Sequence, residues 1–512
     1  MKVFGRWEFN SIGLLNTLIG ISIMLFGRFA PPPSIVVPAS EKLLNLGLPQ
    51  VDGGVLLSIT PMGMAMISLF VGVVYLWTAV DTLWPSFLGV LLLGMSGYMS
   101  MPQVLGKFMG NPMVVMIFFL FIFAAVLIKS NLSAYLAHWF MTRKIVQGKP
   151  WAFTGTILLA TYCVAFFEQT SACFLMWPAL YIIFDHAGFK KGDKYVSVMI
   201  VYTMVMALLC FATDPVKGGA FYLLSNMDNL AASSSDIAIV PINYAKYLFF
   251  GVCVSLVCIA AMLFAMRFIF RIDVSPIKNI NMAEIEKDEL PPMSIQQKII
   301  ILLFVFYAAW LLLPGIIGRD NIIGDFLAKN ALGGTLLVTF ILSFVHIGKK
   351  PIADIVETNS AYPWRTLFLI ATAFLLGGSM TGQGTNVTLF MEYLLRDYLS
   401  GLNGVMLTVA VIVIGILVTN FFNSVVAGLV LTPVLLAICQ AFQLDASPVI
   451  VCFFYIVLVA AATPAASPFA AILYDNTQWV AKKDVAFHAA LASAIVVCVL
   501  IVAGIPLARF LF

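Results

Sequence analysis

Charged residues are scarce in this chain of 512 residues, where they make up 10% of the sequence. Soluble globular proteins carry about 25% charged residues, so the scarcity excludes an ordinary soluble protein. The 28 basic residues and 24 acidic residues give a net charge of only +4, which excludes nucleic-acid binding through a basic surface. Hydrophobic residues make up 62% of the chain. This composition predicts an integral membrane protein.

Motifs for metal, redox or nucleotide chemistry are also lacking. The four histidines show neither HxxxH nor HExxH spacing, and the eight cysteines form no CxxC pair. These absences argue against a zinc site and a thioredoxin-like site. All eight cysteines lie inside apolar runs, so we interpret them as small buried apolar residues. A Gly-Lys-Ser/Thr nucleotide loop is absent as well, and the sequence predicts neither ATP-driven pumping nor a bound cofactor.

The alternation of polar and apolar residues that is typical of barrel strands is missing, and long apolar runs stand in its place. Apart from closed barrels, only helices satisfy their own backbone groups in the lipid core. At ~20 residues for each span, the chain has room for about 11 transmembrane helices. The predicted fold class is therefore an all-α polytopic membrane protein, and two of the apolar runs are predicted to be re-entrant hairpins.

Two apolar runs, 152–187 and 403–440, are too long for one span and carry polar residues near their middle. Basic clusters that include Lys149 and Lys190 flank the first run on both sides. Because basic clusters mark cytoplasmic loops, this run must enter the membrane and return as a hairpin. The flanks of the second run lack such clusters, so we expect that hairpin to enter from outside. The halves then form an inverted repeat, an architecture of secondary transporters.

A polar stretch at 271–296 divides the chain almost in half and is predicted to be a cytoplasmic linker. Residues 1–54 are predicted to form a first span with an external loop, 55–270 repeat 1 and 297–512 repeat 2. Repeat 1 is expected to hold scaffold spans at 55–130, a hairpin and broken helix at 131–226 and a span at 244–270; the counterparts in repeat 2 are 297–347, 387–480 and 486–510. The charge pattern places the N-terminus in the cytoplasm and the C-terminus outside, and we expect the bacterial inner membrane.

Each predicted hairpin has a polar tip, with a proline ten positions after the first residue of that tip. The two tips are Glu168-Gln169-Thr170 and Asn423-Ser424-Val425, and the prolines are Pro178 and Pro433. The half-helix that follows a tip offers N–H groups to an anion, and the preceding half-helix offers carbonyl groups to a cation. Polar residues at this depth are costly unless they line a hydrated cavity, so both tips are candidate binding sites.

Two further helices are interrupted, and these breaks match the hairpins in order. The first break contains Asp214 and Lys217, and the second contains Ser467 and Pro468. Asp214 lies 46 positions after Glu168, and Ser467 lies 44 positions after Asn423. Each half of the chain is therefore expected to supply one hairpin tip and one unwound helix to a common site.

This order of elements resembles the divalent anion/sodium symporter (DASS) family of the ion transporter superfamily. The resemblance is carried by Thr419–Pro433, by Ala466-Ser467-Pro468, and by Pro363-Trp364 followed by Gly377-Gly378. It implies elevator-type alternating access, a di- or tricarboxylate as substrate, sodium coupling and a homodimer. The first spans of each repeat would then form the scaffold and the dimer surface. From their amphipathic pattern, the segments 132–145 and 387–399 are predicted to be interfacial helices that frame the moving domain, or plain loop helices.

The resemblance also implies site residues, carried over by position. A sodium site would use Thr419, Asn423, Ser424 and the carbonyl group of Ala466. The substrate would meet Gln169, Thr170, Lys217, Asn423, Ser424, Ser467 and Pro468. Val425 occupies a tip position where the family has a residue that touches the substrate, and its side chain cannot form a hydrogen bond.

Glu168, Asp214 and Lys217 depart from the family pattern, which has uncharged residues at these positions. An isolated charge costs ~2.5–3.5 kcal/mol at the centre of a spanning helix, so three such groups indicate a function. We hypothesise that Lys217 replaces a coupling cation and pairs with Glu168 or Asp214. The rival hypothesis is that Glu168 binds and releases a proton. A third reading is an ion pair that only pins the unwound helix.

The expected function is secondary active transport of small organic anions, coupled to Na⁺ or H⁺. The expected partners are a small anionic solute, the lipid bilayer and a second copy of the chain. Proton-coupled transport or exchange of a monocarboxylate or an amino-acid-like solute is the alternative within the same class. An integral-membrane transferase is the alternative from a different class, and the chain lacks the metal-binding cluster or soluble catalytic domain such an enzyme would need.

Overall fold

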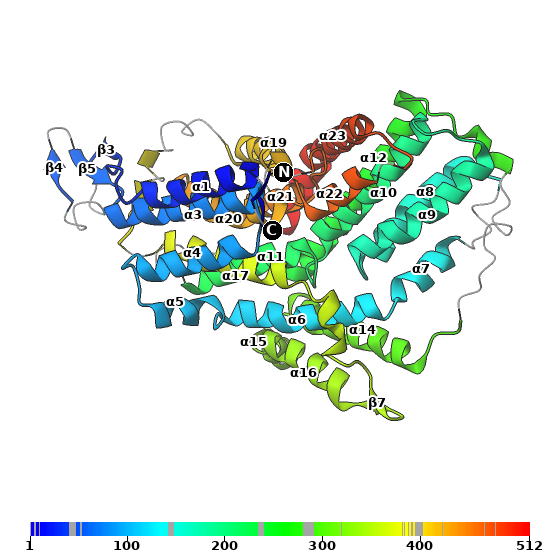
Figure 1. Cartoon of the computed structure of the whole chain (residues 1–512), viewed down its shortest axis with the longest axis horizontal. Helices are drawn as coiled ribbons and strands as arrows, with labels where there is room; N and C mark the ends of the chain where they lie inside the picture. The colour runs from blue at the N-terminus through cyan, green and yellow to red at the C-terminus, as the bar shows by residue number, and fades with distance from the viewer. Residues whose placement is uncertain are drawn as a thin grey trace.

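The computed structural model of the chain is mostly helical, and helices are found in every part of the molecule (Figure 1). It describes residues 2–4, 7–9, 11–39, 48–51, 54–141, 148–233, 240–279, 291–318, 320–380, 382, 384–387, 389–390, 393–394, 403–421, 423–464, 466–476 and 478–512. The central part of the predicted linker, 280–290, therefore lies outside the described residues, as does most of the predicted interfacial helix 387–399. Its counterpart in the first half is a helix, α7 (Leu132–Met141).

Most helices of the first half lie within the apolar runs, and two short helices lie between runs. The helices of this half are α1 (Ser11–Phe26), α3 (Pro61–Ala79), α4 (Trp84–Met95), α5 (Met101–Phe108), α6 (Pro112–Lys129), α7, α8 (Pro150–Ala165), α9 (Gln169–Ala187), α10 (Lys194–Thr213), α11 (Gly219–Ser233) and α12 (Tyr244–Phe264), which continues as the π-helix η2 (Ala265–Ile269). Three of them, α3, α6 and α8, begin on proline. Proline suits this position because its fixed φ is helical and its missing N–H would have no partner there.

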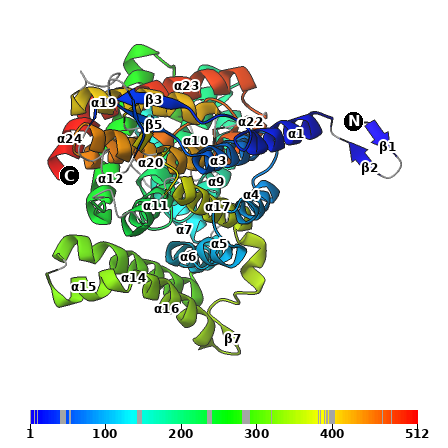
Figure 2. The ribbon, with the colours of Figure 1, turned by 90° about the vertical axis from the view of Figure 1, so that its left-hand side faces the viewer.

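The second half begins with the 3₁₀ turn η3 (Ser275–Asn279) and continues as a series of helices. They are α14 (Ile295–Ile317), α15 (Ile322–Lys329), α16 (Ala331–Phe344), the 3₁₀ turn η4 (Glu357–Ala361), α17 (Trp364–Met380), α19 (Gly404–Phe421), α20 (Ser424–Ala441), α21 (Ala446–Val457), α22 (Pro468–Asp475), α23 (Lys482–Val499), the π-helix η5 (Leu500–Gly504) and α24 (Ile505–Leu511). In Figure 2, α14, α15 and α16 form a layer of their own on one side of the molecule.

Short strands add a feature that the apolar runs do not predict. β3 (Ser34–Val37), β5 (Gly54–Ser58) and β4 (Gln50–Val51) form an antiparallel sheet, and β1 (Lys2–Phe4) pairs with β2 (Trp7–Phe9). β6 (His346–Ile347) pairs with β7 (Lys350–Pro351). The run from residue 55 was expected to be helical throughout, but it begins as β5, where Val55 and Leu57 are buried and alternate with half-buried neighbours. Alternate burial with period two stabilises a strand rather than a helix.

The fold class is confirmed, because the structure is helical and contains several helices able to cross a bilayer. By length and composition, 7 of the described helices could span a membrane, or 8 if the bent pair α15 and α16 is one span. The axes of α15 and α16 differ by 75°. Shorter apolar helices, α8 and α20 among them, fall below the length needed for this test. The count of about eleven spans, the domain boundaries and the opposite orientation of the halves stay predictions.

The first long run is a hairpin of two helices rather than one straight helix. α8 and α9 are joined by a short turn, and both pack on α10 (Figure 1). The open ends of the hairpin meet the same residue on α10. The Thr154 hydroxyl on α8 lies 3.0 Å from the Tyr195 hydroxyl, and the Phe189 ring beyond α9 stacks on the Tyr195 ring at 5.3 Å. The tip at Glu168 therefore lies at the far end, as predicted.

The second long run is a hairpin as well. α19 and α20 contact each other and both pack on α21. Gly404 at the start of α19 faces Leu444, which follows the end of α20. At the other end, Thr419 of α19 bonds to the last residue of α21, Val457. The helices thus run in opposite directions, and their shared tip lies beside the end of α21.

Candidate functional site

The break in the first interrupted helix contains a buried ion pair. Asp214 follows α10, and one of its carboxylate oxygens accepts hydrogen bonds from the backbone N–H groups of Val216 at 2.9 Å and Lys217 at 3.4 Å. The Lys217 Nζ lies 4.0 Å from the other carboxylate oxygen, which has no hydrogen-bond partner among the described residues. Asp214 is 1% exposed and Lys217 is 8% exposed. A carboxylate and an ammonium group are therefore held together away from water, where each charge depends on the other.

The tip of the first hairpin is organised by Glu168. Its carboxylate caps α9 by accepting hydrogen bonds from the backbone N–H of Thr170 at 3.0 Å and from that of Ser171. Gln169 is buried, and its amide nitrogen has no hydrogen-bond partner among the described residues. Gln169 thus offers a donor that a bound solute could satisfy, whereas Glu168 is engaged with its own helix.

These two observations decide between the partners expected for Lys217. The structure pairs Lys217 with Asp214, three positions away in the sequence, and uses Glu168 as a helix cap. Both carboxylate oxygens of Glu168 accept hydrogen bonds from N–H groups of its own helix, so they are engaged there and not with Lys217. The geometry therefore favours the Asp214–Lys217 pair over Glu168 as the charged centre of the site.

The second tip and the second break are in direct contact. The backbone N–H of Ser424 donates to the Ala466 carbonyl at 2.8 Å, and the Thr419 hydroxyl donates to the Val457 carbonyl at 2.8 Å. Asn423 caps α20, because its side-chain oxygen accepts hydrogen bonds from the backbone N–H groups of Val425 at 3.1 Å and Val426 at 3.3 Å. The four residues expected to bind sodium, Thr419, Asn423, Ser424 and Ala466, therefore gather at this junction. Hydroxyl, amide and carbonyl oxygens are suitable ligands for a small hard cation.

The second break ends where Ser467 and Pro468 start α22. Pro468 occupies the first position of the helix, and the Ser467 hydroxyl accepts a hydrogen bond from the Ala470 N–H at 3.1 Å. Ser467 is 3% exposed, and Val425 at the facing tip is 9% exposed. Ser467 therefore lies at a helix N-terminus and its contact with a substrate stays a prediction, while Val425 contributes apolar packing.

Asn420 is a residue that the sequence reasoning did not assign. Its side-chain oxygen accepts the Ala462 N–H at 2.8 Å, and its carbonyl accepts the Thr463 hydroxyl. The Ala462 carbonyl in turn accepts the Tyr474 hydroxyl. Asn420 therefore fixes the conformation of the second unwound segment. The sequence feature that could have identified Asn420 is its position, because it is a second asparagine three residues before Asn423 in an apolar run.

The two interrupted helices lie against each other, so the halves of the chain share one centre. The rings of Phe211 before the first break and Phe469 after the second lie 5.0 Å apart. A Cβ atom on Gly219 would come within 2.4 Å of the Phe211 ring and 2.8 Å of the Leu458 side chain, so a larger residue here would displace both side chains. The breaks are thus neighbours in space although they lie about half the chain apart.

A chain of buried hydroxyl groups also ties the halves together. The Ser255 hydroxyl on α12 lies 2.9 Å from that of Thr213 beside the first break and 2.8 Å from that of Tyr455 near the end of α21. Further along, the Tyr181 hydroxyl on α9 donates to the Asn476 side chain at 2.6 Å, beside a cavity of 360 Å³ between α9 and α22. The first hairpin, both interrupted helices and α12 therefore form one connected unit.

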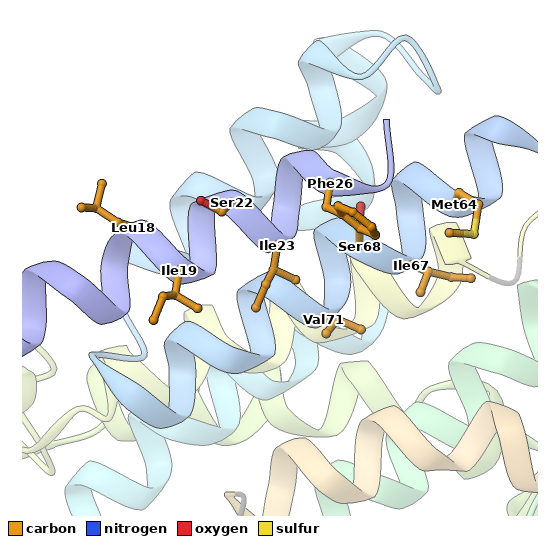
Figure 3. A pocket seen from close by; sticks show the side chains of 9 residues that line it. All are labelled: Leu18, Ile19, Ser22, Ile23, Phe26, Met64, Ile67, Ser68 and Val71. Carbon is orange, nitrogen blue, oxygen red and sulfur yellow. The ribbon is translucent and has the colours of Figure 1, made fainter. Parts of the chain in front are cut away.

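An apolar cavity of 580 Å³ between α1 and α3 is of a different kind (Figure 3). It is lined by apolar side chains such as Leu18, Phe26 and Met64, together with Ser22 and Ser68. The Ser68 hydroxyl is already bonded to the backbone N–H of Gly27 and the carbonyl of Met24. A cavity without charged groups does not suit an organic anion, so it is not the candidate site.

Comparison with solved structures places the fold among membrane transporters. It is similar to the YdaH transporter of Alcanivorax borkumensis, with a TM-score of 0.58, 12% identity and 98% of each chain covered. It is also similar to MtrF of Neisseria gonorrhoeae, from a class of antimetabolite efflux pumps, with a TM-score of 0.54, 14% identity and coverage of 97% of this chain and 94% of that one. At these identities the likeness establishes the fold alone.

The model of the citrate transporter family, CitMHS, matches residues 55–425, and the chain belongs to this family. The search of curated proteins gave no match. Membership confirms an integral membrane protein of a secondary transporter family, as the sequence predicts. It also confirms the ion transporter superfamily as the broader group, while the specific resemblance to the divalent anion/sodium symporters stays a prediction.

Proposed function

We propose that this protein is a secondary active transporter of citrate-like tricarboxylates and dicarboxylates, coupled to a cation and working by elevator-type alternating access. The observation that carries this proposal is the junction of the second tip and second break beside the first break, in a chain of the citrate transporter family. The site would lie in the bacterial inner membrane, with the N-terminus in the cytoplasm and the C-terminus outside.

Lys217 is the proposed attractor of the anion. The N–H groups at the starts of α9, α20 and α22 are bonded to the caps Glu168, Asn423 and Ser467, so these helix ends are already satisfied in part. A buried ammonium group paired at 4.0 Å with a single carboxylate retains capacity to attract a second one. Gln169 and Thr170 at the first tip, and Ser467 and Pro468 at the second break, would then orient the solute.

Sodium is the proposed coupling ion at the second tip. The Thr419 hydroxyl donates its proton to Val457, which leaves its oxygen lone pairs free to face a cation. The Asn423 and Ser424 side chains and the Ala466 carbonyl would complete an oxygen site. Filling this site would neutralise part of the charge of a bound anion and hold the tip against the break.

Uptake of radiolabelled citrate into proteoliposomes tests the proposal. We expect saturable uptake that rises with an inward sodium gradient. Thr419→Val should raise the sodium concentration for half-maximal uptake about ten-fold, which corresponds to the loss of one ligand worth ~1.4 kcal/mol. Thr432→Val is the matched control, because Thr432 is also a buried threonine of this hairpin but bonds to Gly428 of its own helix. Absence of citrate uptake under both sodium and proton gradients would contradict the proposal.

Proton-coupled transport or exchange of a monocarboxylate or amino-acid-like solute is the second candidate. The observation in its favour is the Asp214–Lys217 pair, since an internal ammonium group can take the place of a coupling cation. In that case Lys217→Ala should change the sodium dependence of uptake, and wild-type uptake should follow the proton gradient. Unchanged sodium dependence in Lys217→Ala would count against the replacement.

A further inference from the structure

A cavity of 910 Å³ opens at the C-terminal end of α14, away from the linker that precedes this helix. Its lining combines apolar residues with polar ones, among them Asp228 on α11, Tyr244 on α12 and Trp310 on α14. The Tyr244 hydroxyl donates to the Asp228 carboxylate at 2.8 Å. Lys329 also lines the cavity, and it is paired with Asp325 at 2.7 Å. This is a polar, half-open cavity at the end of a spanning helix.

Hydroxyl groups continue inward from this cavity by one helical turn. Ser225 lies three positions before Asp228 on α11, and Tyr307 lies three positions before Trp310 on α14. Residues three apart share a helix face, so both follow the cavity lining deeper into the protein. Ser225 is 0% exposed and Tyr307 is 1% exposed, and the Tyr307 hydroxyl has no hydrogen-bond partner among the described residues.

The same row of groups reaches the ion pair of the first break. The Tyr244 ring of the cavity lining lies 6.4 Å from the Phe221 ring on α11, and the neighbouring Tyr222 ring lies 6.2 Å from the Phe211 ring, three positions before Asp214. The ionisable groups around Asp214 are Lys217, the Cys210 thiol of α10, the Tyr222 phenol of α11 and the Tyr307 phenol of α14. The Asp214 carboxylate oxygen that lies 4.0 Å from the Lys217 Nζ also lacks a hydrogen-bond partner among the described residues.

Buried hydroxyls and carboxylate oxygens without partners cost about 1–3 kcal/mol each, and ordered water is the usual way to remove that cost. We propose that Asp228, Tyr244, Ser225 and Tyr307 line a hydrated path that carries protons between the cavity and the Asp214–Lys217 pair. This inference rests on the proton-coupled form of the proposed transport function, since it gives the proton a route to that site. A hydronium ion in the cavity gives a proton to the Asp228 carboxylate and becomes water, and Asp228 then releases a proton to the next hydroxyl or water. Each hydroxyl or water accepts one proton as it releases another, and the last proton forms an O–H bond on Asp214.

Thiol labelling tests whether the path is hydrated, without any transport measurement. Ser225→Cys should react with N-ethylmaleimide at least ten-fold faster than Leu224→Cys, its equally buried neighbour on the apolar side of α11. Peptide mass spectrometry separates each site from the native thiols, and buried Cys258 and Cys452 serve as internal references. A Ser225→Cys thiol as slow as these references would overturn the path. So would equal labelling of Leu224→Cys, which would indicate general opening of α11.

Proton flux with a pH-sensitive dye inside proteoliposomes tests the role of the path. Tyr307→Phe should slow solute-driven proton movement at least ten-fold while solute binding, measured by thermal shift, stays within two-fold of wild type. Tyr202→Phe is the matched control, because its hydroxyl on α10 is also buried without a partner among the described residues. Unchanged proton flux in Tyr307→Phe, or equal loss in Tyr202→Phe, would overturn the proposal. Absence of solute binding in wild type would instead contradict the proposed function, and the labelling result would stand.

Discussion

Lys217 and Asp214 are the residues on which the site depends most. Both charges are buried beside the first break, and their only charged partner within 4.0 Å among the described residues is each other. Removing one partner of such a pair leaves an uncompensated buried charge, which costs ~3–5 kcal/mol, whereas removing both can be nearly neutral. The pair therefore has a strong signature in stability measurements, whatever solute the protein carries.

Lys217→Ala is expected to lower the free energy of unfolding by ~3–5 kcal/mol, and Lys217→Ala combined with Asp214→Asn should recover most of that loss. Denaturant unfolding in detergent, followed by circular dichroism, measures both. Lys329→Ala is the control, because Lys329 forms an exposed pair with Asp325 and its loss should cost at most about 1 kcal/mol. Equal stabilities of Lys217→Ala and wild type would contradict a buried ion pair.

Asn420 leads to a second prediction at the scale of one residue. Asn420→Leu removes the acceptor of the Ala462 N–H and should cost about 1–3 kcal/mol, because a half-buried donor loses its partner. We expect citrate uptake to fall more steeply than stability, since the second unwound segment loses its fixed conformation. Unfolding and uptake measured on the same preparation separate these effects, and undiminished uptake would contradict the assignment.

At the scale of elements, the hairpins and broken helices act as one connected unit. Ser255 is the link between the breaks, with hydroxyl contacts of 2.9 Å to Thr213 and 2.8 Å to Tyr455. Ser255→Ala should destabilise the protein by about 1–3 kcal/mol, because two buried hydroxyls lose a partner. It should lower the maximal rate of uptake more than the apparent affinity, which steady-state kinetics would resolve. Ser493→Ala on α23 is a control for a buried serine outside this link.

The sequence allowed the tips and breaks to be predicted, because polar residues in long apolar runs are conspicuous and their offsets match. The sequence could not show whether Glu168 or Asp214 pairs with Lys217, because the answer depends on the Glu168 side chain capping α9 instead. Nor could it place Ser255 or Tyr307, which are single polar residues in otherwise apolar helices. β5 was missed because its apolar residues adjoin those of α3 without a polar gap, so the two elements look like one run.

At the scale of the whole molecule, α14 is the least buried of the candidate spans described, and we propose it as part of the homodimer surface. Only 17% of its spanning window is buried inside the chain, the smallest share among the 7 candidate spans described. Leu302 and Val305 are 65% and 58% exposed on this helix. The predicted scaffold segment 297–347 contains it, which agrees with the dimer surface expected from the resemblance.

Substituting Leu302 and Val305 together by asparagine should therefore convert the dimer into monomers, as measured by native mass spectrometry. The same double substitution at Leu256 and Val257, which are 46% and 44% exposed on α12, should leave the dimer intact. A monomeric wild-type protein, or a dimer that tolerates the α14 substitutions, would contradict this surface.

The central claim is that both hairpin tips enclose one solute and reach each side of the membrane in turn. The most direct measurement is labelling of Ser171→Cys at the first tip and Val425→Cys at the second with a membrane-impermeant thiol reagent, added to either side of sealed vesicles. We predict that both sites are labelled from either side and that citrate with sodium slows both together at least ten-fold. Labelling of each site from one fixed side only, unaffected by citrate and sodium, would contradict the account.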